Sequence, residues 1–218
     1  MAYPARDLLE RAAVSVTPGP DANRLVPLIA SGAASTSSVA AIALAQRHVI
    51  PADERSFRHL AGRAAAEEPE CVPFFTSLAE GEGLAYEHLG PLLAACGVGP
   101  EEAAAYEPLP GCQAYPSYVA WLALNAAPGD TVVALTANFA AWGGYCATLA
   151  ESLHTHYGFP DEACAFFDLF ATPSPTLEKQ ALAGVQAAAD AGCLTDTPLH
   201  HARLLQTYEQ MFWDTLTP

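Results

Sequence analysis

The chain has 218 residues, of which 51% are hydrophobic and 15% are charged. This is enough apolar sequence for one domain with a substantial core, and one domain is the simplest count. The 24 acidic against 9 basic side chains give a net charge of −15, which repels phosphate backbones and anionic lipid surfaces. We therefore expect no nucleic-acid partner and no membrane partner.

Cysteine use and the N-terminus indicate the cellular compartment. The six cysteines are scattered without a Cys-x-x-Cys pair, and the first residues lack a basic region followed by an apolar stretch. No segment is apolar over enough residues to predict a transmembrane span. These observations predict a cytoplasmic protein whose thiols are reduced and lie mostly in the core.

Helix dominates the predicted secondary structure. Alanine and leucine are frequent, and alternating runs of β-branched residues are nearly absent. Proline and glycine clusters separate the helical segments, and Pro51 is interpreted as one such break. Asp130, Asp161 and Ser174 are plausible N-caps. We expect helices over residues 5–15, 23–33, 37–50, 53–67, 70–96, 113–126, 130–157, 161–171, 175–191 and 198–214. The predicted fold class is all-α, a single helical domain over residues 1–218 with residues 1–22 as a peripheral segment.

Two early helices carry candidate binding residues. In the helix expected at 37–50, Gln46 shares one side with Val39 and Ile42, so it faces the core side. In the helix expected at 70–96, Glu82 and Tyr86 share a face at i, i+4 spacing. This face borders the core, which makes both side chains candidates for contact with a ligand.

Two middle helices add aromatic and polar side chains. Tyr115 and Tyr118 begin the segment 113–126, where tyrosines are more often packing anchors than catalysts. In the helix 130–157, Asn138, Trp142 and Cys146 are spaced by four and lie along one stripe, with Tyr145 beside them. The adjacent pair Gly143-Gly144 costs roughly 1 kcal/mol per glycine relative to alanine. Close approach of a neighbouring helix is the favoured reason, and room for a ligand is the alternative.

The last helix carries one carboxylate within an apolar and aromatic surface. Leu205, Tyr208 and Phe212 recur at helical spacing, with Trp213 on the neighbouring face. Glu209 lies within reach of this inward stripe, and a partly buried carboxylate is unfavourable unless it is paired or functional. A Glu209 held at the rim by a salt bridge or a hydroxyl is the alternative interpretation.

No motif predicts a metal or a cofactor. Among the seven histidines, only His154 stands at helical ligand spacing from a glutamate, Glu151. A di-iron bundle needs two such pairs and two further glutamates. Nucleotide-binding and serine-hydrolase motifs are absent from the sequence. We therefore expect no metal and no cofactor.

Several motifs, taken in order, resemble the TenA (thiaminase II) family. Tyr208-Glu209-Gln210-Met211-Phe212-Trp213 resembles the family's last helix, in which the matching glutamate faces the active site. Three further segments are similar to family elements: Leu78-Ala79-Glu80-Gly81-Glu82 to its Glu-x-Glu helix, Tyr115-Pro116-Ser117-Tyr118 to its Tyr-Thr-Ser-His segment, whose tyrosine lines the pocket, and Phe166-Phe167-Asp168-Leu169-Phe170 to its Trp-Ile-x-x-Tyr helix. The resemblance covers about residues 25 to 214.

The resemblance implies a haem-oxygenase-like helical bundle without haem. Members of the family are commonly oligomers that hydrolyse an aminopyrimidine in thiamine salvage, with a cysteine nucleophile and the C-terminal glutamate. By spacing, the family's cysteine falls at Ala141 or Trp142, and its pyrimidine-binding aspartate falls at or near Gln46, which carries no charge. Cys146 lies one turn further along the same face. A buried neutral thiol is favoured there over a relocated nucleophile, because no Lys or Arg is near in sequence.

These departures predict a repurposed TenA-like enzyme acting on an amine-bearing small molecule. Its acid–base chemistry would be C–N hydrolysis, elimination or ring closure without a metal, in specialised metabolism, with Glu209 as general acid or base. Two alternatives stay open: an aminopyrimidine hydrolase using Cys146 and Glu209, and a non-catalytic binding or partner subunit. We also expect a homo-oligomer or a complex with a partner protein. The catalytic candidates are Glu209, Glu82, Tyr115 and Cys146, and the substrate-binding candidates are Gln46, Tyr86, Tyr118, Asn138, Trp142, Tyr145 and Tyr208.

Overall fold

The computed structural model describes residues 5–19 and 21–218, and within them the regular structure is entirely helical. This confirms the predicted all-α class. The helices are α1 (Ala5–Ser15), α2 (Leu25–Ala30), α3 (Thr36–Glu67), α4 (Val72–Ala95), α5 (Pro100–Ala105), α6 (Pro110–Asn125), α7 (Pro128–Ser152), α8 (Asp161–Ala171), α9 (Pro175–Ala191) and α10 (Pro198–Leu216), with the short turns η1 (Pro69–Cys71) and η2 (Leu153–Tyr157).

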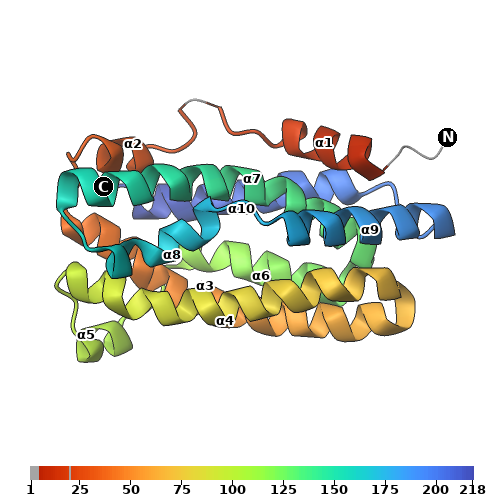
Figure 1. The fold of residues 1–218 in the computed structure, drawn as a ribbon, viewed down its shortest axis with the longest axis horizontal. Coiled ribbons are helices and arrows are strands. Elements are labelled where there is room, and N and C mark those ends of the chain that lie inside the picture. The colour runs from red at the N-terminus through yellow and green to blue at the C-terminus, as the bar shows by residue number, and fades with distance from the viewer. Residues whose placement is uncertain (1–4, 20) are drawn as a thin grey trace.

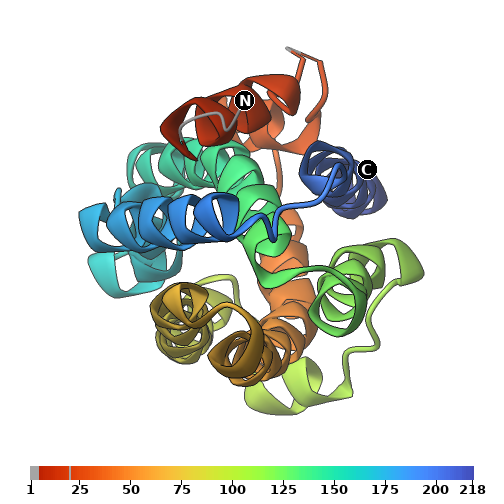
Figure 2. The same ribbon diagram turned by 90° about the vertical axis from the view of Figure 1, so that its right-hand side faces the viewer.

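Helix α7 lies at the centre of the bundle. It packs against α1, α2, α8, α9 and α10, while the long helices α3 and α4 pair along the opposite side (Figures 1 and 2). Helix α6 packs on both α3 and α10. Helices α3, α4, α6, α7 and α10 therefore surround one interior region, and their inward side chains form the candidate site.

Pro51 does not break a helix, contrary to the prediction. Helix α3 continues through Pro51 for 32 residues. A proline within a helix removes one backbone hydrogen bond, and the burial of apolar side chains on both sides of Pro51, from Val39 to Leu60, offsets that loss. The consequence is functional, because residues 39 to 60 keep one helical phase and Asp53 falls on the buried face.

Other expected boundaries differ by a few residues. Helix α5 lies within a segment that was expected to be irregular, and α6 begins at Pro110, where proline is favoured at the first position. Ser174 is confirmed as an N-cap, since its Oγ accepts a hydrogen bond from Leu177 N at 3.3 Å. Asp130 is not an N-cap, because α7 begins two residues earlier; its carboxylate instead accepts from Thr195 N at 3.1 Å. Asp161 is the first residue of α8 and not its cap.

Gly143 lies where a neighbouring helix approaches closely, as predicted. A Cβ added at Gly143 would stand 3.1 Å from the backbone oxygen of Phe170 on α8, whereas one added at Gly144 would meet nothing within 4 Å. The first glycine therefore permits the contact between α7 and α8, and the structure gives no packing reason for the second.

One helical segment, Pro128–Tyr157, is long and apolar enough to cross a membrane by length and composition, although no such segment was expected from the sequence. A core helix of a bundle passes the same test. The segment comprises α7 and η2, and α7 has neighbouring helices on several sides.

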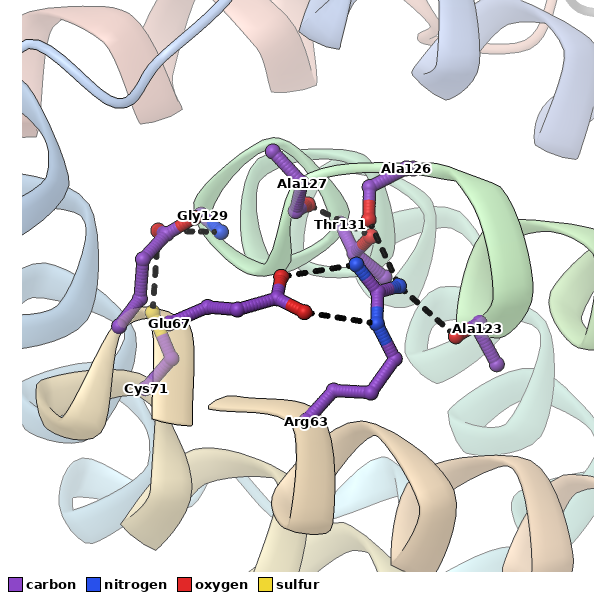
Figure 3. Close-up of polar contacts among 9 residues, drawn as sticks. Arg63, Glu67, Cys71, Ala123, Ala126, Ala127, Gly129 and Thr131 are labelled. Carbon is purple, nitrogen blue, oxygen red and sulfur yellow. Dashed lines mark hydrogen bonds and ion pairs between the residues drawn. The ribbon is translucent and has the colours of Figure 1, made fainter. Parts of the chain in front are cut away.

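A polar clamp joins the end of α3 to the connection between α6 and α7 (Figure 3). Arg63 Nη1 donates to the carbonyl oxygens of Ala123 and Ala126 at 2.9 and 3.0 Å, and its other nitrogens bind Glu67. Glu68 Oε2 accepts from Gly129 N, in the first turn of α7, at 2.9 Å. Backbone groups at a helix end have no hydrogen-bond partner within the helix. Here Arg63 binds two such carbonyls at the end of α6, and Glu68 binds one such N–H at the start of α7.

Arg63→Ala is expected to lower the free energy of unfolding by about 1–3 kcal/mol, because it removes charge-assisted bonds to partly buried carbonyls. Arg58→Ala is the matched control. Arg58 makes the same i, i+4 pairing with Glu54, but its side chain is 64% exposed against 22% for Arg63. Its loss is expected to cost about 0.5 kcal/mol or less. Urea unfolding of both variants measures the difference, and equal effects would contradict the clamp.

Candidate active site

Glu209 lies at the centre of the candidate site. The residue is 4% exposed. Its Oε1 accepts from Trp213 Nε1 at 3.0 Å, and its Oε2 accepts from Asn138 Nδ2 at 2.5 Å and from Gln206 Nε2 at 3.4 Å. Burial raises the pKa of Glu209 to about 7, although these three donors lower it. A carboxyl with such a pKa both gives and takes a proton near neutral pH.

Asn138 of α7 connects Glu209 to two other helices. Its Nδ2 donates to Glu209 and also to Gln206 Oε1 at 3.1 Å, while its Oδ1 accepts from the Tyr115 hydroxyl at 3.2 Å. The phenol of Tyr115 and the carboxylate of Glu209 are therefore bound to the two ends of one buried amide. This network joins α6, α7 and α10 and brings three of the predicted residues together.

A second group of carboxyls faces the same region. Asp53 of α3 is 4% exposed, and its Oδ1 is buried without a hydrogen-bond partner. Burial raises the pKa of Asp53 well above its usual value, and burial followed by the charge of Asp53 does the same for Glu82 of α4. Glu82 keeps intermediate exposure as a residue, so it is the more accessible member of this pair.

Tyr115 lies within the electrostatic reach of both the carboxyl pair and Glu209. Burial raises its pKa, and the charges of Asp53, Glu209 and Glu82 raise it further, in that order. Charges exert such an effect only over short distances in a protein interior. The Tyr115 hydroxyl is therefore placed among three carboxyl groups from three different helices.

Aromatic rings form a wall beside Glu209. Trp213, whose indole binds the carboxylate, has the ring of Tyr145 at 5.3 Å and that of Trp142 at 5.7 Å, and Trp142 meets Phe170 edge-on at 5.7 Å. Burial and then the charge of Glu209 raise the pKa of Tyr145. The predicted residues Trp142 and Tyr145 thus lie next to the carboxyl network.

Cys146 is fully buried on α7 near Glu209. Burial raises the pKa of its thiol well above the usual value, and the charge of Glu209 adds to this effect. Such a thiol is protonated at neutral pH and is a weak nucleophile. The surroundings of Cys146 favour the interpretation as a buried neutral thiol.

Among the described residues, four predicted binding residues have neither a hydrogen bond to this network nor a ring contact with Trp213. Tyr86 is 40% exposed on α4, and Gln46 is buried on α3. The Tyr118 hydroxyl lies 2.8 Å from His201 Nδ1, and its ring stacks on Trp121 at 5.6 Å and lies 5.0 Å from that of Tyr208. Tyr118 and Tyr208 line a groove of about 370 Å³ on α6 and α10.

Sequence reasoning missed Asp53 and Gln206. Asp53 was placed at the start of a new helix after Pro51; a continuous helix would have put it seven residues from Gln46 on the same face. Gln206 lies three residues before Glu209, at a spacing at which helical side chains meet. Both signals were available in the helical periodicity.

No group of three or more His, Cys, Asp or Glu side chains within residues 5–19 and 21–218 is arranged to hold a metal ion. Glu151 and His154 are the one pair that the sequence placed at ligand spacing. His154 Nδ1 lies 3.8 Å from Asp161 Oδ1.

The fold and the site together define a helical bundle that encloses hydrogen-bonded carboxyls beside an aromatic wall. Solved structures share this fold. A domain of unknown function with a haem-oxygenase-like fold from Shewanella denitrificans matches at a TM-score of 0.69 and 15% identity, covering 97% of this chain and 89% of the other. A TenA homologue from P. horikoshii matches at 0.66 and 15%, covering 97% and 95%. A TenA homologue from Pseudomonas syringae pv. tomato matches at 0.70 and 12%, covering 96% and 88%.

The chain therefore has the haem-oxygenase-like fold that TenA homologues also have, as the sequence motifs predicted. No protein-family model matches the sequence, and no curated protein matches it.

Proposed function

We propose that this protein is an enzyme that carries out acid–base chemistry on an amine-bearing small molecule, with Glu209 as the proton-transfer group. The observation that carries this proposal is the combination of a buried carboxyl of pKa about 7 with a second pair of carboxyls whose pKa values are raised. In this pair Asp53 is buried with one oxygen that lacks a partner, and Glu82 is partly accessible. Such perturbed groups are typical of functional sites.

Asp53 and Glu82 are suited to bind an ammonium or amidinium group. A cation between them would offset the burial that raises both pKa values and the repulsion that adds to the shift at Glu82, and Asp53 Oδ1 would gain a donor. The net charge of −15 favours the approach of cations from solution. The aromatic wall of Trp142, Tyr145 and Trp213 would then cover the apolar part of the molecule.

Glu209 would act on the part of the substrate that lies away from Asp53 and Glu82. Tyr115 and Asn138 stand between these two carboxyl groups and Glu209. The ionised form of Glu209 takes a proton from an ammonium group, which turns that amine into a nucleophile for ring closure, or it takes the proton of a C–H bond in an elimination that releases the leaving group. Its protonated form gives the proton to a leaving nitrogen in C–N cleavage. Asn138, held by both Tyr115 and Gln206, keeps the carboxyl in place.

The test is a two-stage screen of primary amines and amidines. Compounds that raise the melting temperature of the wild type at pH 7.5 but not that of Asp53→Asn are selected, and their conversion is followed by mass spectrometry. Glu209→Gln is expected to lower turnover by at least about 100-fold, whereas Cys146→Ala is expected to retain it. Binding without turnover in the wild type would instead indicate a non-catalytic binding subunit.

Aminopyrimidine hydrolysis is the second candidate, because Asp53 supplies a buried carboxyl on the early helix where the sequence had indicated only Gln46. The wild type and Cys146→Ala are assayed with thiamine and with 4-amino-5-aminomethyl-2-methylpyrimidine. Turnover that disappears in Cys146→Ala would establish Cys146 as the nucleophile and would contradict the first proposal.

A further inference from the structure

We propose that the groove between α10 and residues Ser15–Pro18 is the entrance to the Glu209 site and that the side chain of Gln206 is the gate that closes it. This inference rests on the proposed function only in taking Glu209 as part of the site. It does not depend on which reaction takes place there.

The buried network requires an entrance. Asn138 is 1% exposed, and Asp53 and Glu209 are each 4% exposed. A substrate that reaches these groups must pass a side chain that moves. The gate is therefore expected to be a residue that touches both solvent and the network.

Gln206 meets both conditions. Its amide oxygen accepts from Asn138 Nδ2 at 3.1 Å, and its amide nitrogen donates to Glu209 Oε2 at 3.4 Å. The same side chain lines a surface groove of about 340 Å³. The residue has intermediate exposure, whereas Asn138 and Glu209 are buried.

The groove has two walls of described residues. One wall is α10, with Gln206 flanked by Thr207 and Gln210, and the other contains Ser15–Pro18 and Ala22. Gln210 Nε2 donates to the backbone oxygen of Ala22, which holds the two walls together at one end. The groove is thus a fixed depression, and Gln206 is the part of its lining that is bonded to Glu209.

Rotation of Gln206 would have two linked effects. The contact of 3.4 Å to Glu209 is at the long end of hydrogen bonds, and a partly exposed glutamine changes rotamer rapidly. When the amide swings into the groove, Glu209 becomes accessible and loses one hydrogen-bond donor. Gln206 is therefore a gate and also a positioning residue for Glu209.

Carbodiimide labelling tests the gate without any substrate. The protein is treated with a water-soluble carbodiimide and glycinamide at pH 5.5, where Glu209 is mainly protonated in every variant, and labelling of each carboxyl is followed by peptide mass spectrometry. Gln206→Ala is expected to accelerate labelling of Glu209 at least ten-fold. The exposed Glu101 reports the intrinsic rate, and the buried Asp130 reports any general opening of the fold.

Two variants at Thr207 locate the route. Thr207 is exposed in the same groove wall, and its hydroxyl donates to the backbone oxygen of Arg203. Thr207→Ala, the matched control, is expected to leave Glu209 labelling unchanged. Adding Thr207→Trp to Gln206→Ala is expected to return labelling to the wild-type rate, because the indole fills the groove.

Three results would overturn the inference: unchanged labelling in Gln206→Ala, a parallel rise at Asp130, or a double variant as fast as Gln206→Ala. Gln206→Met, which keeps the length of the side chain without its amide, gives the same comparison if the alanine variant is unstable. The proposed reaction fails on a different measurement, the absence of amine turnover.

Discussion

Between pH 5 and pH 8, the wild type is expected to lose about 2–3 kcal/mol of folding stability that Glu209→Gln does not lose. In the folded protein the pKa of Glu209 is about 7, against a usual value of 4.5. The folded state therefore binds the proton more tightly than the unfolded state. Stability from this group is fully present below about pH 4.5 and is lost as the pH rises through about 7.

Urea unfolding of both proteins at half-unit pH intervals measures this effect. In Glu209→Gln, the new NH₂ group would face an N–H donor of Trp213 or Asn138, which leaves donors unpaired. The variant is therefore destabilised by an amount that does not change with pH. Only the difference between the two proteins in the slope of unfolding free energy against pH is diagnostic, because the other carboxyls titrate in both proteins. Parallel curves would mean that Glu209 has an ordinary pKa and would remove the basis for its catalytic role.

Asp53→Asn is expected to raise stability at pH 8 by about 1–2 kcal/mol while abolishing stabilisation by amines. Burial raises the pKa of Asp53, so its ionised form is unfavourable in the folded protein at this pH. The neutral amide removes that cost and also the repulsion that acts on Glu82. The gain should shrink as the pH falls, because Asp53 then takes up a proton.

Thermal unfolding at pH 8 and pH 5, with and without an amine ligand, gives both parts of this result. Glu54→Gln is the control, since Glu54 lies on the same helix, pairs with the exposed Arg58 and has only the smaller of the two charge effects on Glu82. Destabilisation by Asp53→Asn at pH 8 would show that Asp53 is a structural group with a partner in the fold. The carboxyl pair would then no longer support cation binding.

The sequence predicted most of the fold because its helices are separated by proline and glycine and carry clear apolar periodicity. The prediction also grouped Glu209, Asn138 and Tyr115 in one site. Glu209 and Asn138 were chosen by their inward helical spacing, and Tyr115 by the resemblance of its segment to a TenA element. The errors have physical causes. Pro51 was interpreted by local propensity alone, while the apolar face of α3 continues through it, and this interpretation hid Asp53.

Other site residues depended on tertiary contacts that no local pattern encodes. Tyr118 and Tyr208 have the spacing of inward residues, yet Tyr118 packs with Tyr208, Trp121 and His201 and not with the carboxyl network. Tyr86 shares the i, i+4 face of Glu82 but is largely in solvent. The rotation of each helix about its axis decides these cases, and that rotation is set by neighbouring helices.

The clamp at the α6–α7 connection has a consequence for the geometry of the site. Tyr115 and Asn138 lie the same number of residues from the centre of the two-residue turn Ala126–Ala127, roughly 17 Å along each helix. The hydrogen bond between them therefore depends on the phase in which the two helices leave the turn. One residue inserted there would rotate one of these side chains by about 100° relative to the other. Arg63 and Glu68 thus set, from the end of the bundle, the alignment of two side chains that they never touch.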